Sequence, residues 1–544
     1  MTDRRGPVEG ARGEGPEGAA GTARPVLDAR LLPAALVCWS VTIVAVGMGW
    51  AAGVGVGLAL VVAALGSWAL LWTGAAHRTE RRRVLATAVV GTALLGAAFA
   101  VAGAWREHQV SAHPLRAVPA AAAVRVVVTP TDDPKPVRGS GSGAGRLWVL
   151  RAELREYEYR DRVVRAGGSV LLLASGPEWG ELRPGRPLEF RARPAPPRQR
   201  DLTVVTLRPV GEPVAVGTLP WWQAAAHTVR ADLAGAAGVA LAPDAAGVLP
   251  ALVVGDTSGV TDRLHAEFVA AGLQHLTVVS GANFTIVLTG VLALTRLLTL
   301  GPRISLFVAA GALVSFVIIA RPDPSVLRAA AMGSVTLLAL LTGRRKQALP
   351  ALCAAVIGLL LWRPELAVQA GFALSVLATG ALLLLAPSWT DYLRARGWWR
   401  LPAELVAVAA AAFVVTAPLT IALSGRLGLL AVVANILVAP VIAPVTILGA
   451  VAACTAGWVP IAAELMLRPA APLLWWLLTV AHEAAAVPGA TVTVPGGVVG
   501  GLSAAVIVAT GICALRAPPI RRVVLAATAG VLAAQLVLSL WASG

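Results

Sequence analysis

The segment "QHLTVVSGANFTIV", residues 274–287, is apolar enough to enter a membrane, yet it carries three hydrogen-bonding side chains. These are His275, Ser280 and Asn283, and a Ser280–Gly281 pair lies in the middle of the segment. Polar groups at such depth are costly unless they face protein or a water-filled cavity. A Ser-Gly pair also favours a helix break, whose free backbone groups need a cavity or a neighbouring helix. The residues support equally a contact between helices and the lining of a pathway.

Two charged residues near this segment are further candidates. Asp256 ends the apolar run "LVVGD", and we include it among the residues expected to line a pathway. Arg328 lies about one turn into an apolar span that begins near Pro324. An arginine at that depth either extends to the lipid headgroups, which is the commoner case, or faces the same polar interior as His275.

Two later stretches combine small or polar residues with helix-breaking ones. The stretch "RPELAVQAGFALSVLATG" places three such residues on one helix face: Gln369, Gly371 and Ser375. Small and polar residues at this spacing are most often packing devices. The stretch "VVANILVAPVIAPV" contains an asparagine followed by two prolines: Asn435, Pro440 and Pro444. Because helices broken in this way usually line a cavity, we expect a pathway here as well.

Enzyme chemistry has little support in the sequence. "VVSGA" is not a G-x-S-x-G elbow, because Val278 and Ala282 occupy the glycine positions. A hydrolase triad of Asp256, His275 and Ser280 is a weak alternative. The histidines do not cluster at metal-ligand spacing and no P-loop occurs. We therefore expect no catalytic residues, no metal and no cofactor.

The composition indicates what positions these residues. Of 544 residues, 57% are hydrophobic and 14% are charged, whereas soluble domains contain about a quarter charged residues. Apolar runs of membrane length recur, so we predict a polytopic α-helical membrane protein with a small inserted all-β domain. The expected parts are a disordered tail (1–30), three transmembrane helices (31–105), a β domain (106–220), an amphipathic interfacial linker (221–250) and a transmembrane core (251–544).

The β domain is predicted from short alternating runs such as "VRVVVTP" and "RPLEFRARP", separated by Gly, Pro and Asp. Five or six strands in about a hundred residues suit an OB-type barrel or a small sandwich. The arginine-rich loop "HRTERRR", residues 77–83, is expected to be cytoplasmic by the positive-inside rule. The N-terminus is then cytoplasmic too, and the third span, 84–104, delivers the β domain to the outer side. Ten further spans are expected between residues 273 and 541.

The polar segments resemble those of a known family, the ComEC competence proteins. "LVVGD" followed by "GLQHLTVVSGAN" is similar to that family's "GD…H-L-x-x-V-S-G" signature. The stretches "PSVLRAAAM", "ELAVQAGFALSVLATGALLL" and "APLTIALSGRLGLLAVVANILVAPVIAPV" match later blocks in the same order. The resemblance covers nearly all of residues 31–541. It departs from the family at Asn283, where many members carry a second histidine.

The resemblance implies an inner-membrane channel that carries single-stranded DNA into the cytoplasm during natural transformation. It also implies a DNA-receptor protein outside and a cytoplasmic helicase or ATPase. The H-x-H-x-D-H motif of the nuclease domain found in many relatives does not occur in this sequence, so we expect a separate nuclease if one strand is degraded. The alternatives are a small-solute transporter or exporter, and a membrane-anchored DNA-binding module without conduction.

If the cargo is DNA, the β domain is expected to bind it weakly. Arginines would contact phosphates and aromatic rings would stack on bases. The candidates are Arg146, Trp148, Arg151 and Tyr157. The alternative is a structural lid with a solvated charged surface.

Overall fold

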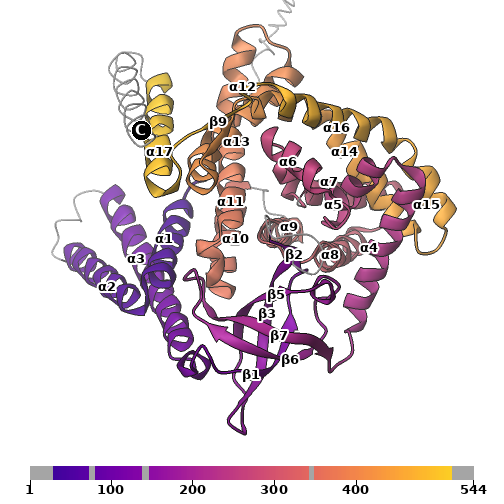
Figure 1. Cartoon of the computed structure of the whole chain (residues 1–544). Helices are drawn as coiled ribbons and strands as arrows, with labels where there is room; N and C mark the ends of the chain where they lie inside the picture. The colour runs from indigo at the N-terminus through magenta and orange to yellow at the C-terminus, as the bar shows by residue number, and fades with distance from the viewer. Residues whose placement is uncertain (1–27, 73–79, 138–145, 278, 342–347, 517–544) are drawn as a thin grey trace, which may run out of the picture.

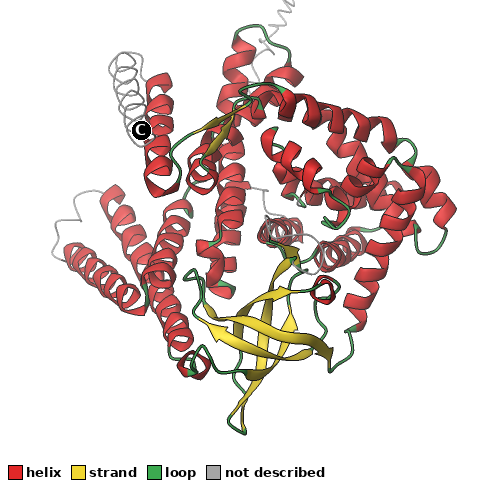
Figure 2. Ribbon diagram, in the orientation of Figure 1, coloured by secondary structure: helices red, strands yellow, loops and turns green. Residues whose placement is uncertain are grey.

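The chain folds into three N-terminal helices, a β-barrel and a larger helical core (Figures 1 and 2). The structure is a computed structural model that describes residues 28–72, 80–137, 146–277, 279–341 and 348–516. It is mostly helical with one inserted β domain, as the sequence predicts. The last of the ten expected spans, which ends at residue 541, lies outside the described residues, as does nearly all of the tail at 1–30.

The N-terminal helices are α1 (Leu32–Met48), α2 (Trp50–Trp72) and α3 (Glu80–Ser111). The third helix continues past its expected end at residue 104, so the β domain begins later than predicted. The unit is joined to the core through α1, where the indole nitrogen of Trp39 donates a hydrogen bond to the carbonyl oxygen of Ala367 at 3.0 Å.

Seven strands form the β domain. They are β1 (Val124–Pro130), β2 (Lys135–Pro136), β3 (Leu147–Tyr159), β4 (Arg162–Val164), β5 (Gly168–Ser175), β6 (Leu188–Ala195) and β7 (Thr203–Ala215). Five of them close a ring in the order β1-β6-β7-β5-β3, because β3 also pairs with β1. The β5–β7 pair is parallel and the other pairs are antiparallel. The result is an OB-like barrel, which confirms the predicted fold class.

Alternation along the strands fills the barrel. In β1 the side chains of Val124, Val126 and Val128 are fully buried, while those between them are more exposed. Trp179 and Phe190 meet edge to face inside the barrel, with 5.0 Å between their ring centroids. These β-branched and aromatic residues explain why this segment forms strands within an otherwise helical chain.

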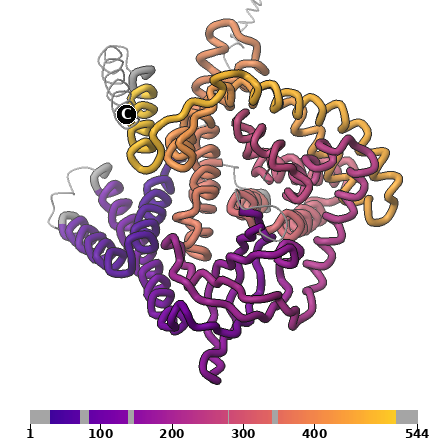
Figure 3. The backbone as a smooth tube through the Cα atoms, in the orientation of Figure 1, coloured from indigo at the N-terminus to yellow at the C-terminus, as the bar shows by residue number. Residues whose placement is uncertain are grey.

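Fourteen α-helices of the described residues follow the barrel. They are α4 (Trp221–Ala240), α5 (Pro243–Val254), α6 (Asp262–Ala270), α7 (Gly281–Leu297), α8 (Pro302–Ala320), α9 (Pro324–Leu341), α10 (Ala348–Trp362), α11 (Ala370–Leu384), α12 (Ala386–Ala395), α13 (Arg400–Ser424), α14 (Ala431–Thr455), α15 (Pro460–Leu467), α16 (Ala470–Ala486) and α17 (Gly497–Arg516). A short ribbon of β8 (Arg426–Gly428) and β9 (Thr491–Thr493) joins the segments after α13 and α16. In Figure 3 the core forms an arc over the barrel, from α10 and α11 through α16 to α15 and α4.

Six helices of the described residues are long and apolar enough to cross a membrane, or seven if the bent pair α15–α16 counts as one span. Six shorter apolar helices of 10–17 residues accompany them, including α1, α7 and α9. The chain is therefore a multi-pass membrane protein.

The predicted linker at 221–250 belongs to the core. Leu233 of α4 and Leu249 and Leu252 of α5 are buried in one apolar cluster with Phe268 and Val445. The expected boundary at residue 250 thus falls inside α5. Because α5 is buried along most of its length, an interfacial position stays a prediction for α4 alone.

Candidate functional site

The Ser280–Gly281 pair breaks the apolar segment, as its residue types suggest. A single 3-10 turn covers Gln274–Thr277, and α7 begins only at Gly281, so the span that was expected from residue 273 starts later. Ser280 is the N-cap, and its hydroxyl accepts a hydrogen bond from the backbone N–H of Asn283 at 3.2 Å. The Ser325 hydroxyl donates to the Val279 carbonyl at 2.9 Å and satisfies the backbone at the break.

His275 and Asn283 lie in different surroundings. The imidazole of His275 is exposed on the 3-10 turn. Asn283 is 1% exposed, and its side-chain nitrogen donates to the carbonyl oxygen of Leu252 at 2.7 Å. That carbonyl lies in the last turn of α5, where the helix supplies no donor. Asn283 therefore joins α7 to α5, and its expected place on an open pathway wall is wrong.

Arg328 turns into the core instead of extending to headgroups. It is 6% exposed, and its Nε donates to the Ser375 hydroxyl at 2.7 Å. A Cβ added at Gly281 would lie 2.7 Å from Nη2 of Arg328, so the guanidinium group packs directly against the first residue of α7. Three predicted residues from α7, α9 and α11 thus meet at one point.

This point, which we call the Arg328 cluster (Gly281, Arg328 and Ser375), is electropositive. Among the described residues no carboxylate lies within ion-pair distance of Arg328. The N-terminus of the 17-residue helix α7 adds the positive end of its dipole and unpaired backbone N–H groups. Both features attract anions, and here they act where little water competes.

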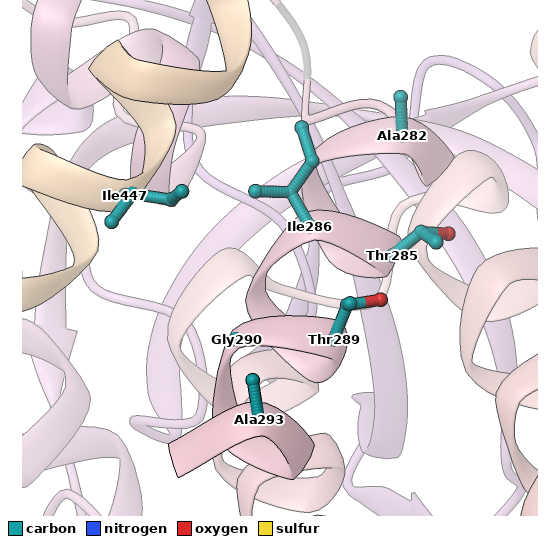
Figure 4. A pocket seen from close by; sticks show the side chains of 7 residues that line it. All are labelled: Ala282, Thr285, Ile286, Thr289, Gly290, Ala293 and Ile447. Atoms are coloured by element: carbon teal, nitrogen blue, oxygen red, sulfur yellow. The ribbon is translucent and has the colours of Figure 1, made fainter. Parts of the chain in front are cut away.

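An open cavity of about 530 Å³ follows α7 from the residue after Gly281 (Figure 4). Small and hydroxyl side chains recur along it at helical spacing, and one isoleucine of α14 lies across from Ile286. The lining residues are Ala282, Thr285, Ile286, Thr289, Gly290, Ala293 and Ile447. None of these lining residues was among the predicted candidates, although Thr285 and Thr289 belong to the stretch that follows Ser280.

Asp256 supports the turn after α5. Its Oδ1 accepts hydrogen bonds from the backbone N–H and the hydroxyl of Ser258, at 3.1 and 2.7 Å. Gly255 before it has φ +72°, a backbone conformation that glycine adopts without strain. Oδ1 of Asp256 also lies 3.9 Å from a guanidinium nitrogen of Arg230.

Three predicted candidates of the helical core remain: Gln369, Gly371 and Asn435. Gln369 precedes α11 without capping it, and Gly371 lies near Pro324 at the start of α9. Asn435 donates to the Ala431 carbonyl of its own helix at 2.7 Å.

The prolines of α14 do not break it. The helix runs unbroken through Pro440 and Pro444, so the expected interruption is wrong. A membrane helix tolerates the missing N–H donors when its neighbours hold it in place, and Trp476 of α16 donates to the Leu437 carbonyl at 2.9 Å.

The barrel candidates are less available than expected. Tyr157 is 4% exposed in the barrel core, so stacking of its ring on a base is wrong. The Arg146 guanidinium lies 5.3 Å from the Trp148 ring centroid, and a Cβ at Gly180 would come within 2.5 Å of that ring. Arg151 is paired with Asp201 at 3.0 Å. Arg146 and Trp148 remain half-buried candidates whose ring face is already covered.

No group of three His, Cys, Asp or Glu side chains that could hold a metal ion occurs among the described residues. A charged cluster that the sequence did not suggest joins the barrel to the core instead, through Asp133, Arg230 and Arg321. The sequence could not predict this cluster, because two aspartates in a loop and single arginines in helical segments do not indicate which charges will pair.

Comparison with known proteins addresses the core directly. Residues 252–519 match the family model described as Competence protein. The chain is also similar to ComE operon protein 3 of Bacillus subtilis (strain 168), with 33% identity over 144 residues. That alignment covers 26% of this chain and 19% of the relative, so the chain matches about a fifth of the relative's length. No solved structure matches. These similarities support a competence protein of the ComEC type, and the matched helical core includes the Arg328 cluster at the start of α7.

Proposed function

We propose that the core is a channel through which single-stranded DNA enters the cytoplasm during natural transformation. Similarity to the competence family supports a role in DNA uptake. The observation that carries the channel assignment is the Arg328 cluster: a buried guanidinium group at a helix N-terminus, with no carboxylate beside it among the described residues.

The Arg328 cluster suits a phosphate that must bind and then leave. A guanidinium group recognises phosphate oxygens through fixed N–H donors. A single such site with hydroxyl neighbours holds an anion less firmly than a dense row of cations, and conduction requires release as well as entry. The open cavity along α7 begins one residue after Gly281, and the residues of the Arg328 cluster do not line it.

The orientation follows from charge. With the arginine-rich loop at 77–83 inside, the N-terminus is cytoplasmic and the barrel faces outward. A receptor would then deliver DNA at the barrel side, a helicase or ATPase would draw it inward, and a separate nuclease would remove the other strand.

The test is uptake of labelled DNA by a strain that lacks this protein and is complemented with variants. Arg328→Gln removes the charge and should lower uptake by about 10- to 150-fold, the equivalent of a charged hydrogen bond of roughly 1.5–3 kcal/mol. Arg296→Gln is the matched control, because Arg296 is an exposed arginine in the last turn of α7.

Three outcomes would contradict the proposal. Undiminished DNA uptake in the deletion strain would remove the channel role altogether. Normal uptake with Arg328→Gln at normal protein level would move the pathway elsewhere. DNA that binds to the cells but never enters would favour the membrane-anchored binding module.

A further inference from the structure

The loop that follows β1 carries an acidic side chain from the barrel into the helical core. Strand β1 ends at Pro130, and Asp132 and Asp133 precede the short strand β2. Figure 1 shows β2 extending from the barrel toward α8 and α9. In barrels of this topology the loop between the first two ring strands is one that contacts oligonucleotides. Here that loop presents the Asp133 carboxylate to the helical core of the protein.

Asp133 lies between two guanidinium groups of the core. Its Oδ1 is 2.5 Å from Nη1 of Arg321, and its Oδ2 is 3.4 Å from Nη2 of Arg230. The side chains of Arg230 and Arg321 are only 7% and 15% exposed, whereas that of Asp133 is 38% exposed. The Asp133 carboxylate therefore lies between two cations that are largely removed from water, and Arg230 also faces Asp256 at 3.9 Å.

The carboxylate satisfies these cations incompletely. Nη1 of Arg321 is buried and makes no hydrogen bond among the described residues, although it is ion-paired with Asp133. Burial raises the pKa of the Asp133 carboxyl even though Arg321 and Arg230 lie beside it. The contact with Arg321 brings the charges together without a hydrogen bond, and the hydrogen bond from Arg230 to Asp133 is long at 3.4 Å. An anion with more acceptor oxygens could therefore replace the Asp133 carboxylate.

The backbone at Arg321 is also unusual. Arg321 caps the C-terminus of α8 with φ +67°, in the left-handed region that non-glycine residues rarely adopt. Strained backbone of this kind persists where surrounding contacts hold it, and it concentrates at ligand clamps and switch regions. In this conformation the guanidinium group of Arg321 reaches the barrel loop at Asp133.

We propose that Arg230 and Arg321 form a phosphodiester-binding site at the junction of barrel and core, which Asp133 occupies until a nucleic acid strand displaces it. The inference rests on the proposed function only in that a single strand is the anion that arrives there. The Asp133 carboxylate stands in for a phosphate, so the loop closes the site in the resting protein. A strand with many phosphates competes well because each one that is displaced is replaced by its neighbour.

The experiment measures binding of a fluorescent single-stranded oligonucleotide to the full chain in nanodiscs, by anisotropy at several salt concentrations. Asp133→Asn keeps the shape of the side chain and removes its charge, so the affinity should rise by about tenfold at low salt. The salt slope should steepen by up to about 1.4, because each newly available arginine contributes roughly 0.7 for a single strand.

Matched variants separate this site from general charge effects. Asp132→Asn makes the same charge change one residue away, where no ion pair is formed among the described residues. It should raise affinity clearly less than Asp133→Asn does, because Asp132 acts on Arg321 more weakly than Asp133. Asp133→Glu retains a carboxylate and should bind like the unaltered chain. Arg321→Gln combined with Asp133→Asn should abolish most of the gain.

The proposal is overturned if Asp133→Asn binds no more tightly than Asp132→Asn, or if the gain survives Arg321→Gln. Should Asp133→Asn aggregate, Asp133→Ser replaces it with the same expectation. The two proposals can be contradicted separately. Normal DNA uptake together with unchanged oligonucleotide binding by Asp133→Asn contradicts only the proposal that Asp133 occupies a phosphodiester site. The expected binding pattern without DNA uptake contradicts only the proposal of a channel.

Discussion

Adding one methyl group at Gly281 should displace Arg328 and impair DNA passage. In Gly281→Ala the new Cβ would lie 2.7 Å from Nη2 of Arg328, closer than real contacts allow, and 3.6 Å from Ala329. The guanidinium group is the flexible end of its side chain, so it moves before the helices do. Its 2.7 Å hydrogen bond to Ser375 is then lost or lengthened.

The magnitude follows from two opposing effects. Loss of a hydrogen bond to a charged group costs roughly 1.5–3 kcal/mol. Replacing glycine by alanine in a helix returns up to about 1 kcal/mol. The net loss of roughly 0.5–2 kcal/mol in the free energy of unfolding corresponds to a factor of about 2–30 in the folding equilibrium. Uptake should fall as well, because the displaced guanidinium group no longer lies at the anion site.

The assay pairs uptake of labelled DNA with thermal melting of the detergent-solubilised chain. Gly311→Ala is the control, because a Cβ at this exposed position of α8 meets no atom within 4 Å. If Gly281→Ala takes up DNA as well as Gly311→Ala and is equally stabilised, Arg328 does not pack where its role requires.

Two further predictions concern buried polar groups. Asn283→Ala leaves the Leu252 carbonyl without its donor and should lower the free energy of unfolding by about 1–3 kcal/mol in a denaturant melt. Thr285→Ala loses only a hydrogen bond within its own helix and should change this free energy little. Equal losses in the two variants would show that the hydrogen bond between α7 and α5 is absent. His113 accepts a hydrogen bond from the backbone N–H of Leu115, and burial lowers its pKa below 6.5. As the pH falls, the unfolded chain therefore takes up a proton at this histidine before the folded chain does. The contribution of His113 to the free energy of unfolding should be fully present above about pH 6.5 and decrease below it. His113→Asn should weaken this pH dependence in melts at pH 7 and pH 5.

The sequence predicted those features that depend on neighbouring residues. Alternating valines in Val124–Pro130 require a strand with one buried face, and the closed barrel supplies it. The Ser280–Gly281 pair predicted a helix break because serine is a favoured N-cap residue and glycine is conformationally flexible. Both effects act within one turn of the helix. Local chemistry of this kind does not depend on the rest of the fold.

The features that were missed depend on distant partners. Whether Arg328 faces headgroups or protein is decided by Ser375 on another helix, 47 positions later. Asp133 finds Arg230 across 97 positions, from a loop whose composition suggests only flexibility. The prolines at 440 and 444 misled for the same reason, because the contacts of α14 with its neighbours, rather than its own residues, keep it helical.

The hydrogen bond between Trp39 and Ala367 can form only late in the synthesis of the chain. Its partners are 328 residues apart, and at about 5–20 residues per second a ribosome needs roughly 15–65 s to make the intervening chain. During that interval the face of α1 that carries the buried Cys38 has no α10 to cover it. A ribosome that stalls before residue 348 leaves this face of α1 uncovered, and quality-control proteases should recognise such a fragment.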